Sequence, residues 1–177
     1  MELSTKSDDL LIGVVGGGAM GQGIVQVSLE GGMKVVLFDA KTGGGSEAKD
    51  AIFGRLERNV EKGRLEKNVL ENIKQNLVLA TDLSEFKKCD VVIEAVFEDI
   101  DVKLEVFKEV EKWVAPNCVI ASNTSSLPIA SLGRYCQHQN RFAGLHFFNP
   151  VPLMRLVEVI KGPVSYTHLT LPTICSV

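Results

Sequence analysis

Hydrophobic positions near the start of the chain alternate between two spacings. Residues 10–15 form a nearly continuous apolar run, which is typical of a central parallel strand covered on both faces. Residues 19–29 then repeat their apolar positions at helical spacing, and residues 34–38 form a second apolar run that closes on Asp39. A strand, a glycine-rich turn, a helix and a strand within about 30 residues predict one βαβ unit.

Residues 42–75 are polar and charged and have no strand pattern. Apolar side chains of the first half share one helical face and basic side chains lie roughly opposite; the two sets are Ile52, Phe53, Leu56 and Val60, and Arg55, Arg58 and Lys62. Gly63 interrupts the pattern, which resumes over residues 65–73. The segment therefore predicts a helical hairpin inserted into the βαβ core.

The remaining chain again alternates strands with helices. The pattern predicts strands at 77–79, 90–95 and 118–121, an amphipathic helix at 99–114, and two extended segments at 142–146 and 154–160 around a proline-rich turn. This order predicts an α/β fold with a doubly wound, mainly parallel sheet of the Rossmann type.

A GxGxxG motif lies between the first predicted strand and helix. Gly16 allows a tight turn, Gly18 lets the backbone approach a pyrophosphate, and Gly21 lets the helix lie close to the sheet. The first helical residues, Ala19 and Met20, would offer free N–H groups to the phosphates. The motif predicts a dinucleotide site at this turn.

Asp39 ends the second predicted strand, about 20 residues after the glycines, where this fingerprint places an acid. A carboxylate there accepts hydrogen bonds from ribose hydroxyls and repels a 2′-phosphate, which favours NAD over NADP. The alternative is a glycine turn and a solvated aspartate in an unrelated α/β protein.

Composition limits the partners. The 177 residues suffice for one buried domain, and the net charge of −3 supplies no field for nucleic acid or an anionic membrane. No metal-binding spacing occurs among the four cysteines, which we interpret as reduced thiols. The start has no signal-peptide pattern and no apolar stretch is long enough to cross a membrane, so we expect a cytoplasmic protein.

Several stretches closely resemble the 3-hydroxyacyl-CoA dehydrogenase family, which includes 3-hydroxybutyryl-CoA dehydrogenases. They are IGVVGGGAMGQGI at the start, VIEAVFE at 92–98, ASNTSSL at 121–127, RFAGLHFFNPVP at 141–152 and LMRLVEVI at 153–160. The resemblance implies an NAD-binding domain at 1–163, normally followed by an all-helical domain that mediates dimerisation and closes the active cleft. It implies NAD-dependent oxidation of L-3-hydroxyacyl-CoA to 3-ketoacyl-CoA, as in β-oxidation of fatty acids.

The resemblance also implies site residues. His146 would be the catalytic acid/base and Glu158 its carboxylate partner, while Ser125 and Asn149 would contact the reacting part of the substrate. These roles are chemically sensible, because a neutral imidazole can take the hydroxyl proton near pH 7 and a carboxylate can orient it. By composition alone, His146 could instead be a buried core histidine.

Further contacts follow from the same resemblance. Glu98 and Lys103 would touch the cofactor, with Ser125 near its nicotinamide, and Lys62 and less surely Arg55 would join Ser125 in contacting CoA. Other interpretations are open: Ser125 could cap a helix that begins near residue 127, Lys103 could be a solvated lysine paired with a glutamate, and the basic helix face could simply be hydrated.

The resemblance ends near Pro163. We expect residues 164–177 to be an aberrant or disordered tail and the chain to be a truncated form without the all-helical domain. NAD binding should then survive, weakened, with turnover very low or absent. Two alternatives remain: a CoA-independent NAD-dependent hydroxy-acid dehydrogenase of the same fold, and a non-catalytic NAD-binding fragment.

Overall fold

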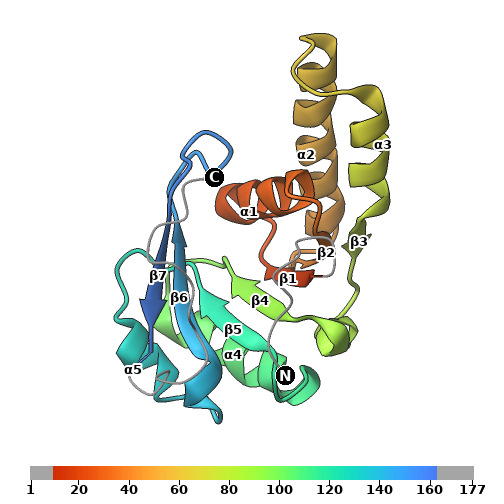
Figure 1. Ribbon diagram of the computed structural model, residues 1–177. Helices are drawn as coiled ribbons and strands as arrows, with labels where there is room; N and C mark the ends of the chain where they lie inside the picture. The colour runs from red at the N-terminus through yellow and green to blue at the C-terminus, as the bar shows by residue number, and fades with distance from the viewer. Residues whose placement is uncertain (1–9, 163–177) are drawn as a thin grey trace.

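The computed structural model describes residues 10–162, so the predicted 164–177 tail lies outside the described residues. Strands and helices alternate as the sequence predicts (Figure 1). In chain order the elements are β1 (Leu11–Val15), α1 (Ala19–Glu30), β2 (Lys34–Phe38), α2 (Gly44–Glu61), α3 (Lys67–Gln75), β3 (Leu77–Leu79), the 3₁₀ helix η2 (Leu83–Lys88), β4 (Val91–Glu94), α4 (Ile100–Trp113), β5 (Val119–Ser122), α5 (Ile129–Gly133), the 3₁₀ helix η3 (Gln139–Arg141), β6 (Phe142–Phe147) and β7 (Val157–Lys161).

The strands form one sheet in the order β3-β2-β1-β4-β5-β6-β7. Every neighbouring pair is parallel except β6 and β7, which are antiparallel. The predicted doubly wound, mainly parallel sheet is therefore confirmed. Strand order reverses between β1 and β4, and the crevice at their carboxyl ends is where such sheets bind ligands.

Two hydrophobic cores cover the two faces of the sheet. On one face α1, α2 and α3 pack against inward side chains of β1 and β2, including Val14 and Leu37. On the other face η2, α4 and α5 pack against the sheet around Phe86, Phe107 and Phe142. The rings of Phe107 and Phe142 meet edge to face with centroids 5.0 Å apart.

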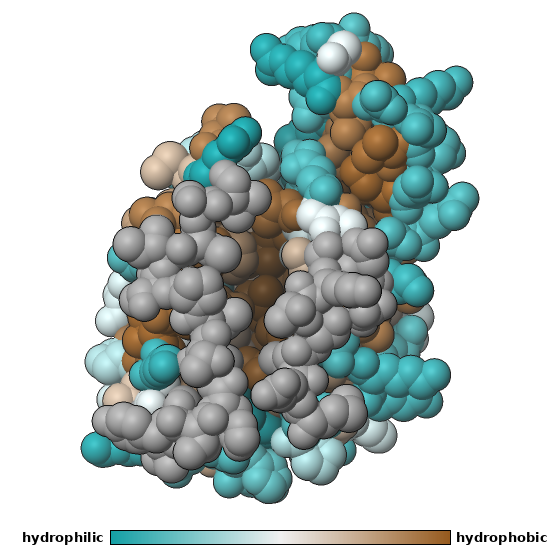
Figure 2. Space-filling view, viewed as in Figure 1, coloured by the Kyte–Doolittle hydropathy of each residue, from teal (hydrophilic) through white to brown (hydrophobic). Residues whose placement is uncertain are grey.

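Helices α2 and α3 form the predicted hairpin, which projects beyond the sheet (Figure 1). Ile52, Leu56, Leu70 and Ile73 are buried between the helices and the core. Gly63, at the break, has φ +66°, a conformation that glycine adopts without strain. The outer surface of the hairpin is hydrophilic, with apolar residues between its helices (Figure 2).

The two 3₁₀ helices were not predicted, because both are too short to produce a hydrophobic period. The 3₁₀ helix η2 begins where the Asp82 carboxylate accepts a hydrogen bond from Ser84 N at 2.8 Å, and it buries Phe86 completely. The other, η3, has only three residues. The helix expected from about residue 127 is the five-residue α5, which begins at Ile129. The second extended segment, expected from residue 154, pairs as a strand only from Val157.

Three of the four cysteines lie in the described part of the chain. Cys89, Cys118 and Cys136 are free and buried, and burial raises the pKa of each thiol to about 12. No group of His, Cys, Asp or Glu among residues 10–162 could hold a metal ion. None of the helices in that range combines the length and hydrophobicity needed to cross a lipid bilayer.

Candidate active site

The glycine turn has the geometry that the motif predicts. Gly16 has φ +106°, and a Cβ there would lie 2.6 Å from the carbonyl oxygen of Ala95. A Cβ on Gly21 would lie 1.8 Å from the carbonyl oxygen of Gly16, so the first turn of α1 rests directly on the end of β1. At Gly18, by contrast, a Cβ would meet no atom of the described residues within 4 Å. The turn is closed beneath and open above, as a pyrophosphate site requires.

Asp39 lies where β2 ends and faces this turn. Its Oδ2 accepts a hydrogen bond from Gly17 N at 2.6 Å, and its Oδ1 accepts one from Lys41 N at 2.8 Å. Because each carboxylate oxygen can accept a second hydrogen bond, the residue retains acceptors for ribose hydroxyls. The turn and Asp39 together fit the adenosine diphosphate half of NAD.

The predicted pair His146 and Glu158 is formed across the β6–β7 ladder. These residues lie directly opposite each other in the antiparallel register, and His146 Nδ1 is 2.9 Å from a Glu158 carboxylate oxygen. The histidine side chain is 19% exposed and the glutamate side chain 54% exposed. The arrangement leaves the other ring nitrogen of His146 available for proton transfer.

His146 opens into a cavity of about 330 Å³ at the carboxyl ends of the parallel strands. Side chains and backbone from the ends of β4, β5 and β6 line it together with α1; they are Met20, Ala95, Val96, Glu98, Lys103, Asn123, Ser125, His146, Phe147, Phe148 and Asn149. The structure therefore brings together all the residues predicted to surround the reacting atoms except Glu158, which stands behind His146.

Ser125 lies in the turn after β5 and does not cap α5. Helix α5 begins at Ile129 without a side-chain cap, so that alternative is wrong. The neighbouring Thr124 stabilises this turn instead: its hydroxyl accepts hydrogen bonds from Ser126 N and Leu127 N, at 3.3 and 3.0 Å. Ser125 itself lines the His146 cavity.

Glu98 lies beside this turn. Its Oε1 accepts hydrogen bonds from the hydroxyls of Thr124 and Ser126, and its Oε2 is 3.1 Å from the Lys103 ammonium. Partial burial alone would raise the pKa of Glu98, but the hydrogen bonds from Thr124, Ser126 and Lys103 outweigh it and lower that pKa to about 2. The residue is therefore a firmly ionised carboxylate.

Lys103 is less accessible than a cofactor contact would be. Its side chain is 0% exposed, and its ammonium lies 2.6 Å from Glu94 Oε1 and 3.1 Å from Glu98 Oε2. The alternative described Lys103 as a solvated lysine paired with a glutamate. The glutamate pairing is confirmed, but the side chain is buried and not solvated. Lys103 contributes to the cavity wall from beneath, behind Glu98.

Asn123 was not singled out from the sequence. Its side-chain oxygen accepts a hydrogen bond from Phe147 N at 2.9 Å, next to His146. It thereby joins the end of β5 to the end of β6 and faces the same cavity. The only available signal was its place in the SNTSS stretch, where a polar residue follows a buried strand.

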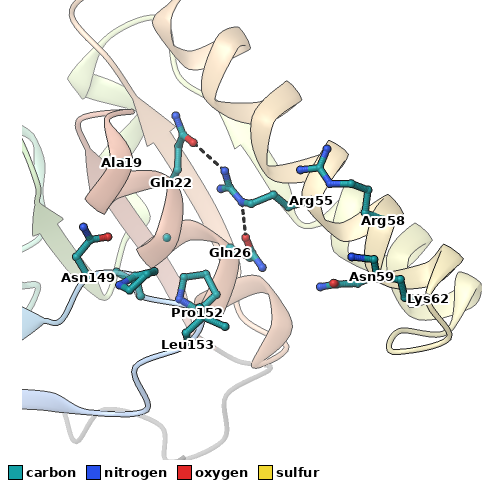
Figure 3. A pocket seen from close by; sticks show the side chains of 13 residues that line it. Ala19, Gln22, Gln26, Arg55, Arg58, Asn59, Lys62, Asn149, Pro152 and Leu153 are labelled. Atoms are coloured by element: carbon teal, nitrogen blue, oxygen red, sulfur yellow. Dashed lines mark hydrogen bonds between the residues drawn. The ribbon is translucent and has the colours of Figure 1, made fainter.

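A second cavity of about 420 Å³ lies between α1, the hairpin and the turn after β6. Arg55, Arg58 and Lys62 line one side, and Asn149, Pro152 and Leu153 lie across from them (Figure 3). Arg55 is engaged within the protein, because its guanidinium donates to Gln26 at 3.0 Å and to Gln22 at 3.1 Å. Asn149 lines both cavities, which places the basic face beside the His146 site.

The turn after β6 is held against α1. Val151 is buried, and a Cβ on Gly23 would lie 2.6 Å from the Val151 Cβ. Only a glycine in α1 permits this approach. The contact brings the turn that carries Asn149 onto the helix that begins at the predicted phosphate site.

A comparison with protein families decides the identity of this domain. The profile described as the 3-hydroxyacyl-CoA dehydrogenase NAD binding domain matches residues 11–174. The chain belongs to the 3-hydroxyacyl-CoA dehydrogenase family. The match extends past Pro163, into the stretch where the sequence resemblance was not evident, so the boundary between 163 and 164 stays a prediction.

Relatives agree with this assignment. The chain is 42% identical over 150 residues to a probable 3-hydroxybutyryl-CoA dehydrogenase of Deinococcus radiodurans, covering 85% of the chain and 54% of that protein. It is 43% identical over 159 residues to the mitochondrial hydroxyacyl-coenzyme A dehydrogenase of Sus scrofa, covering 86% of the chain and 50% of that protein. The chain thus spans about half the length of these relatives.

A solved structure has the same fold. The (S)-3-hydroxybutyryl-CoA dehydrogenase of Ralstonia eutropha superposes with a TM-score of 0.85 at 36% identity, covering 90% of this chain and 56% of that one. The family's NAD-binding domain is therefore the part present here, and NAD is its cofactor. The open space above Gly18 and the acceptors of Asp39 fit that cofactor.

Proposed function

We propose that this dehydrogenase domain carries the catalytic base of an enzyme that oxidises L-3-hydroxyacyl-CoA to 3-ketoacyl-CoA. The observation that carries the proposal is the His146–Glu158 pair, 2.9 Å apart, at the mouth of the cavity where the strands β4 and β5 end. NAD, when bound, accepts the hydride from the carbinol carbon. Hydride loss without loss of the hydroxyl proton would leave an unstable cation, so a base must stand at the hydroxyl.

His146 supplies that base through the ring nitrogen not bonded to Glu158. As the imidazole takes the proton it becomes positive, and the adjacent carboxylate stabilises that charge and fixes the ring orientation. Ser125 and Asn149 face the same cavity and can hold the substrate oxygen as its charge changes. In the reverse direction the same groups polarise the ketone and His146 returns the proton.

The basic cavity favours a CoA ester over a free hydroxy acid. Arg58 and Lys62 point toward a cavity that adjoins Asn149, so an acyl group in the His146 cavity leaves its phosphate-bearing end on the hairpin side (Figure 3). Arg55 donates hydrogen bonds to Gln22 and Gln26 and thereby holds α2 against α1. Its positive charge also lines the cavity, but it is tied to the protein surface. Lys62 is the better candidate for direct contact.

The test uses two proteins: the 177-residue chain, and a fusion of residues 1–162 to the C-terminal part of the Deinococcus radiodurans relative that this chain does not cover. We expect acetoacetyl-CoA-dependent oxidation of NADH to be very slow in the chain and robust in the fusion, because the all-helical domain that the resemblance implies would close the cleft and exclude water from the reaction. His146→Gln in the fusion should lower kcat about 10³-fold while leaving the Kd for NADH unchanged.

Two outcomes would contradict the proposal. An unchanged rate in the His146→Gln fusion would favour the non-catalytic NAD-binding alternative. Reduction of free acetoacetate as fast as its CoA ester would favour the CoA-independent alternative. Replacing Arg58 and Lys62 together by Glu separates the substrates further: the KM should rise for acetoacetyl-CoA and stay constant for a free acid.

A cytoplasmic location, a role in β-oxidation and dimerisation through an all-helical domain belong to the same proposal. A mitochondrial location is the alternative, since the relatives of Sus scrofa, Homo sapiens and Rattus norvegicus are named as mitochondrial. Fractionation of the source cells with an antibody to this chain tests it, and a signal confined to an organelle would exclude the cytoplasm.

A further inference from the structure

The proposed mechanism gives no role to the buried carboxylate at the end of β4. Glu94 ends β4, is 1% exposed, and lies 2.6 Å from the ammonium of Lys103, whose side chain is fully buried. A buried ion pair adds little net stability, because removing both charges from water offsets much of their attraction. The demands of the fold alone therefore do not explain why these two charges stand at the floor of the His146 cavity.

Glu94 joins the two turns that form that cavity. Its Oε1 accepts a hydrogen bond from Val96 N at 2.8 Å, at the start of the turn after β4. Its Oε2 accepts one from the Ser122 hydroxyl at 2.6 Å, at the end of β5. Both carboxylate oxygens are thus committed to different strand ends, and neither faces solvent.

Lys103 extends the connection to Ser125. Its ammonium contacts Glu98 at 3.1 Å, and Glu98 in turn accepts hydrogen bonds from the hydroxyls on both sides of Ser125. A continuous series of charged hydrogen bonds therefore runs from the end of β4, through α4, to the residues flanking Ser125. Such bonds are stronger than neutral ones and fix geometry more tightly.

We propose that Glu94 is a positioning residue for the nicotinamide end of the cofactor site, acting through Lys103 and Ser122 on the turns that carry Glu98 and Ser125. It touches neither cofactor nor substrate. The inference rests on the proposed function only in placing the nicotinamide ring in the His146 cavity. The adenosine end, built on the glycine turn and Asp39, borders this set of contacts at Val96 N, which lies beside Gly16. Among the described residues, Asp39 bonds Gly17 N and Lys41 N and takes no part in the Glu94 contacts.

The test separates the two ends of the cofactor by comparing NADH with ADP-ribose, which lacks the nicotinamide. In the 177-residue chain, Glu94→Gln should weaken NADH binding about tenfold and change the affinity for ADP-ribose less than twofold, because it removes charged hydrogen bonds at one end only. The enhancement of NADH fluorescence on binding should fall as well, since it reports the surroundings of the ring.

A matched control comes from the opposite end of the strands, where α4 ends and β6 begins. Glu111 has a side chain that is only 3% exposed and pairs with Arg141 at 3.6 Å, while accepting hydrogen bonds from Gln137 N and His138 N. Glu111→Gln also removes a buried charge and should lower the thermal midpoint. It should not shift NADH binding relative to ADP-ribose.

Ser122→Ala is the milder companion if Glu94→Gln does not fold. It deletes only the hydroxyl between β5 and Glu94, and should weaken NADH binding about threefold with no change for ADP-ribose. Equal weakening of both ligands in these variants, or weakening of neither, would overturn the proposal, because it would assign Glu94 to general stability or to nothing at this site.

The result is independent of the chemistry at His146. An intact wild-type difference between NADH and ADP-ribose, lost in Glu94→Gln, supports the positioning role even when the fusion does not reduce acetoacetyl-CoA. A wild-type chain that binds NADH no better than ADP-ribose would overturn both the positioning role of Glu94 and the proposed function, since the nicotinamide would then lie outside the His146 cavity.

Discussion

The two halves of the proposed cofactor site are built by different means. On the adenosine side, β1, α1 and β2 use backbone: Gly16 and Gly21 pack the turn tightly, Gly18 leaves it open above, and one carboxylate, Asp39, accepts a hydrogen bond from Gly17 N. On the nicotinamide side, β4, β5 and β6 use side chains, with Glu94, Lys103 and Glu98 linked beneath the cavity. The adenosine half depends on the absence of side-chain atoms at the glycines, and the nicotinamide half depends on charged side chains.

This difference determines what each half tolerates. The adenosine half should lose its ligand when an added side chain fills the glycine turn. Variants there should therefore lose affinity abruptly, and the loss should not depend on pH. The nicotinamide half should instead lose affinity and stability gradually, as individual hydrogen bonds are lost or carboxylates take up protons. Three substitutions test this contrast, beginning with the largest expected effect.

Gly21→Ala should disrupt the adenosine half. Its Cβ would lie 1.8 Å from the Gly16 carbonyl oxygen, which belongs to backbone and can move only if the turn moves. We expect a loss of about 3 kcal/mol in the free energy of unfolding and no measurable NADH binding. Urea denaturation and NADH titration measure the two. The control is Gly54→Ala in α2, where a Cβ meets nothing within 4 Å among the described residues, and which should stabilise the chain by about 0.5–1 kcal/mol.

Gly18→Ala should separate ligand binding from folding. Its backbone, at φ −68° and ψ −174°, is open to alanine, and the added Cβ meets no described residue. The thermal midpoint should therefore stay within about 2 °C of the wild-type value, while NADH and ADP-ribose both bind about tenfold more weakly, a loss of about 1.4 kcal/mol. Unchanged binding of ADP-ribose would mean that the pyrophosphate does not lie over this residue.

Glu98→Gln should have the smallest effect, visible mainly in acid. Hydrogen bonds lower the pKa of Glu98 from an ordinary 4.5 to about 2, against the opposing effect of partial burial. The ionised carboxylate therefore stabilises the fold fully above about pH 4.5, and this contribution is lost as the pH falls toward 2. Thermal unfolding between pH 6 and pH 2 should show wild type above the variant near neutrality, with the gap closing in acid. A gap that stays constant with pH would contradict the low pKa.

The same contrast explains what could be predicted from the sequence. The glycine turn, the sheet and the hairpin follow from local spacing, because a strand, a GxGxxG turn and an amphipathic helix each determine their own backbone. The pairing of His146 with Glu158 followed from resemblance, and the β6–β7 register confirms their contact.

Long-range side-chain contacts could not be predicted. Glu94 is separated from Ser122 by 28 positions, and no periodicity shows that their side chains meet. Asn123 and Phe147 likewise meet only because β5 and β6 are neighbours in the sheet. Lys103 has the sequence setting of a surface lysine in an amphipathic helix. Its burial depends on two carboxylates, one at the end of β4 and one in the turn that follows.

In the proposed reaction, the close contact of Gly23 with Val151 makes these two positions a spacer between cofactor and substrate. Gly23 belongs to the helix that begins at the proposed phosphate site, and Val151 follows Asn149, a proposed substrate contact, by two residues. Hydride transfer tolerates little variation in the separation of donor and acceptor, so the thickness of this contact helps to set the reaction distance. A larger side chain at position 23 would displace the substrate turn outward, leaving both binding sites whole but their occupants too far apart to react.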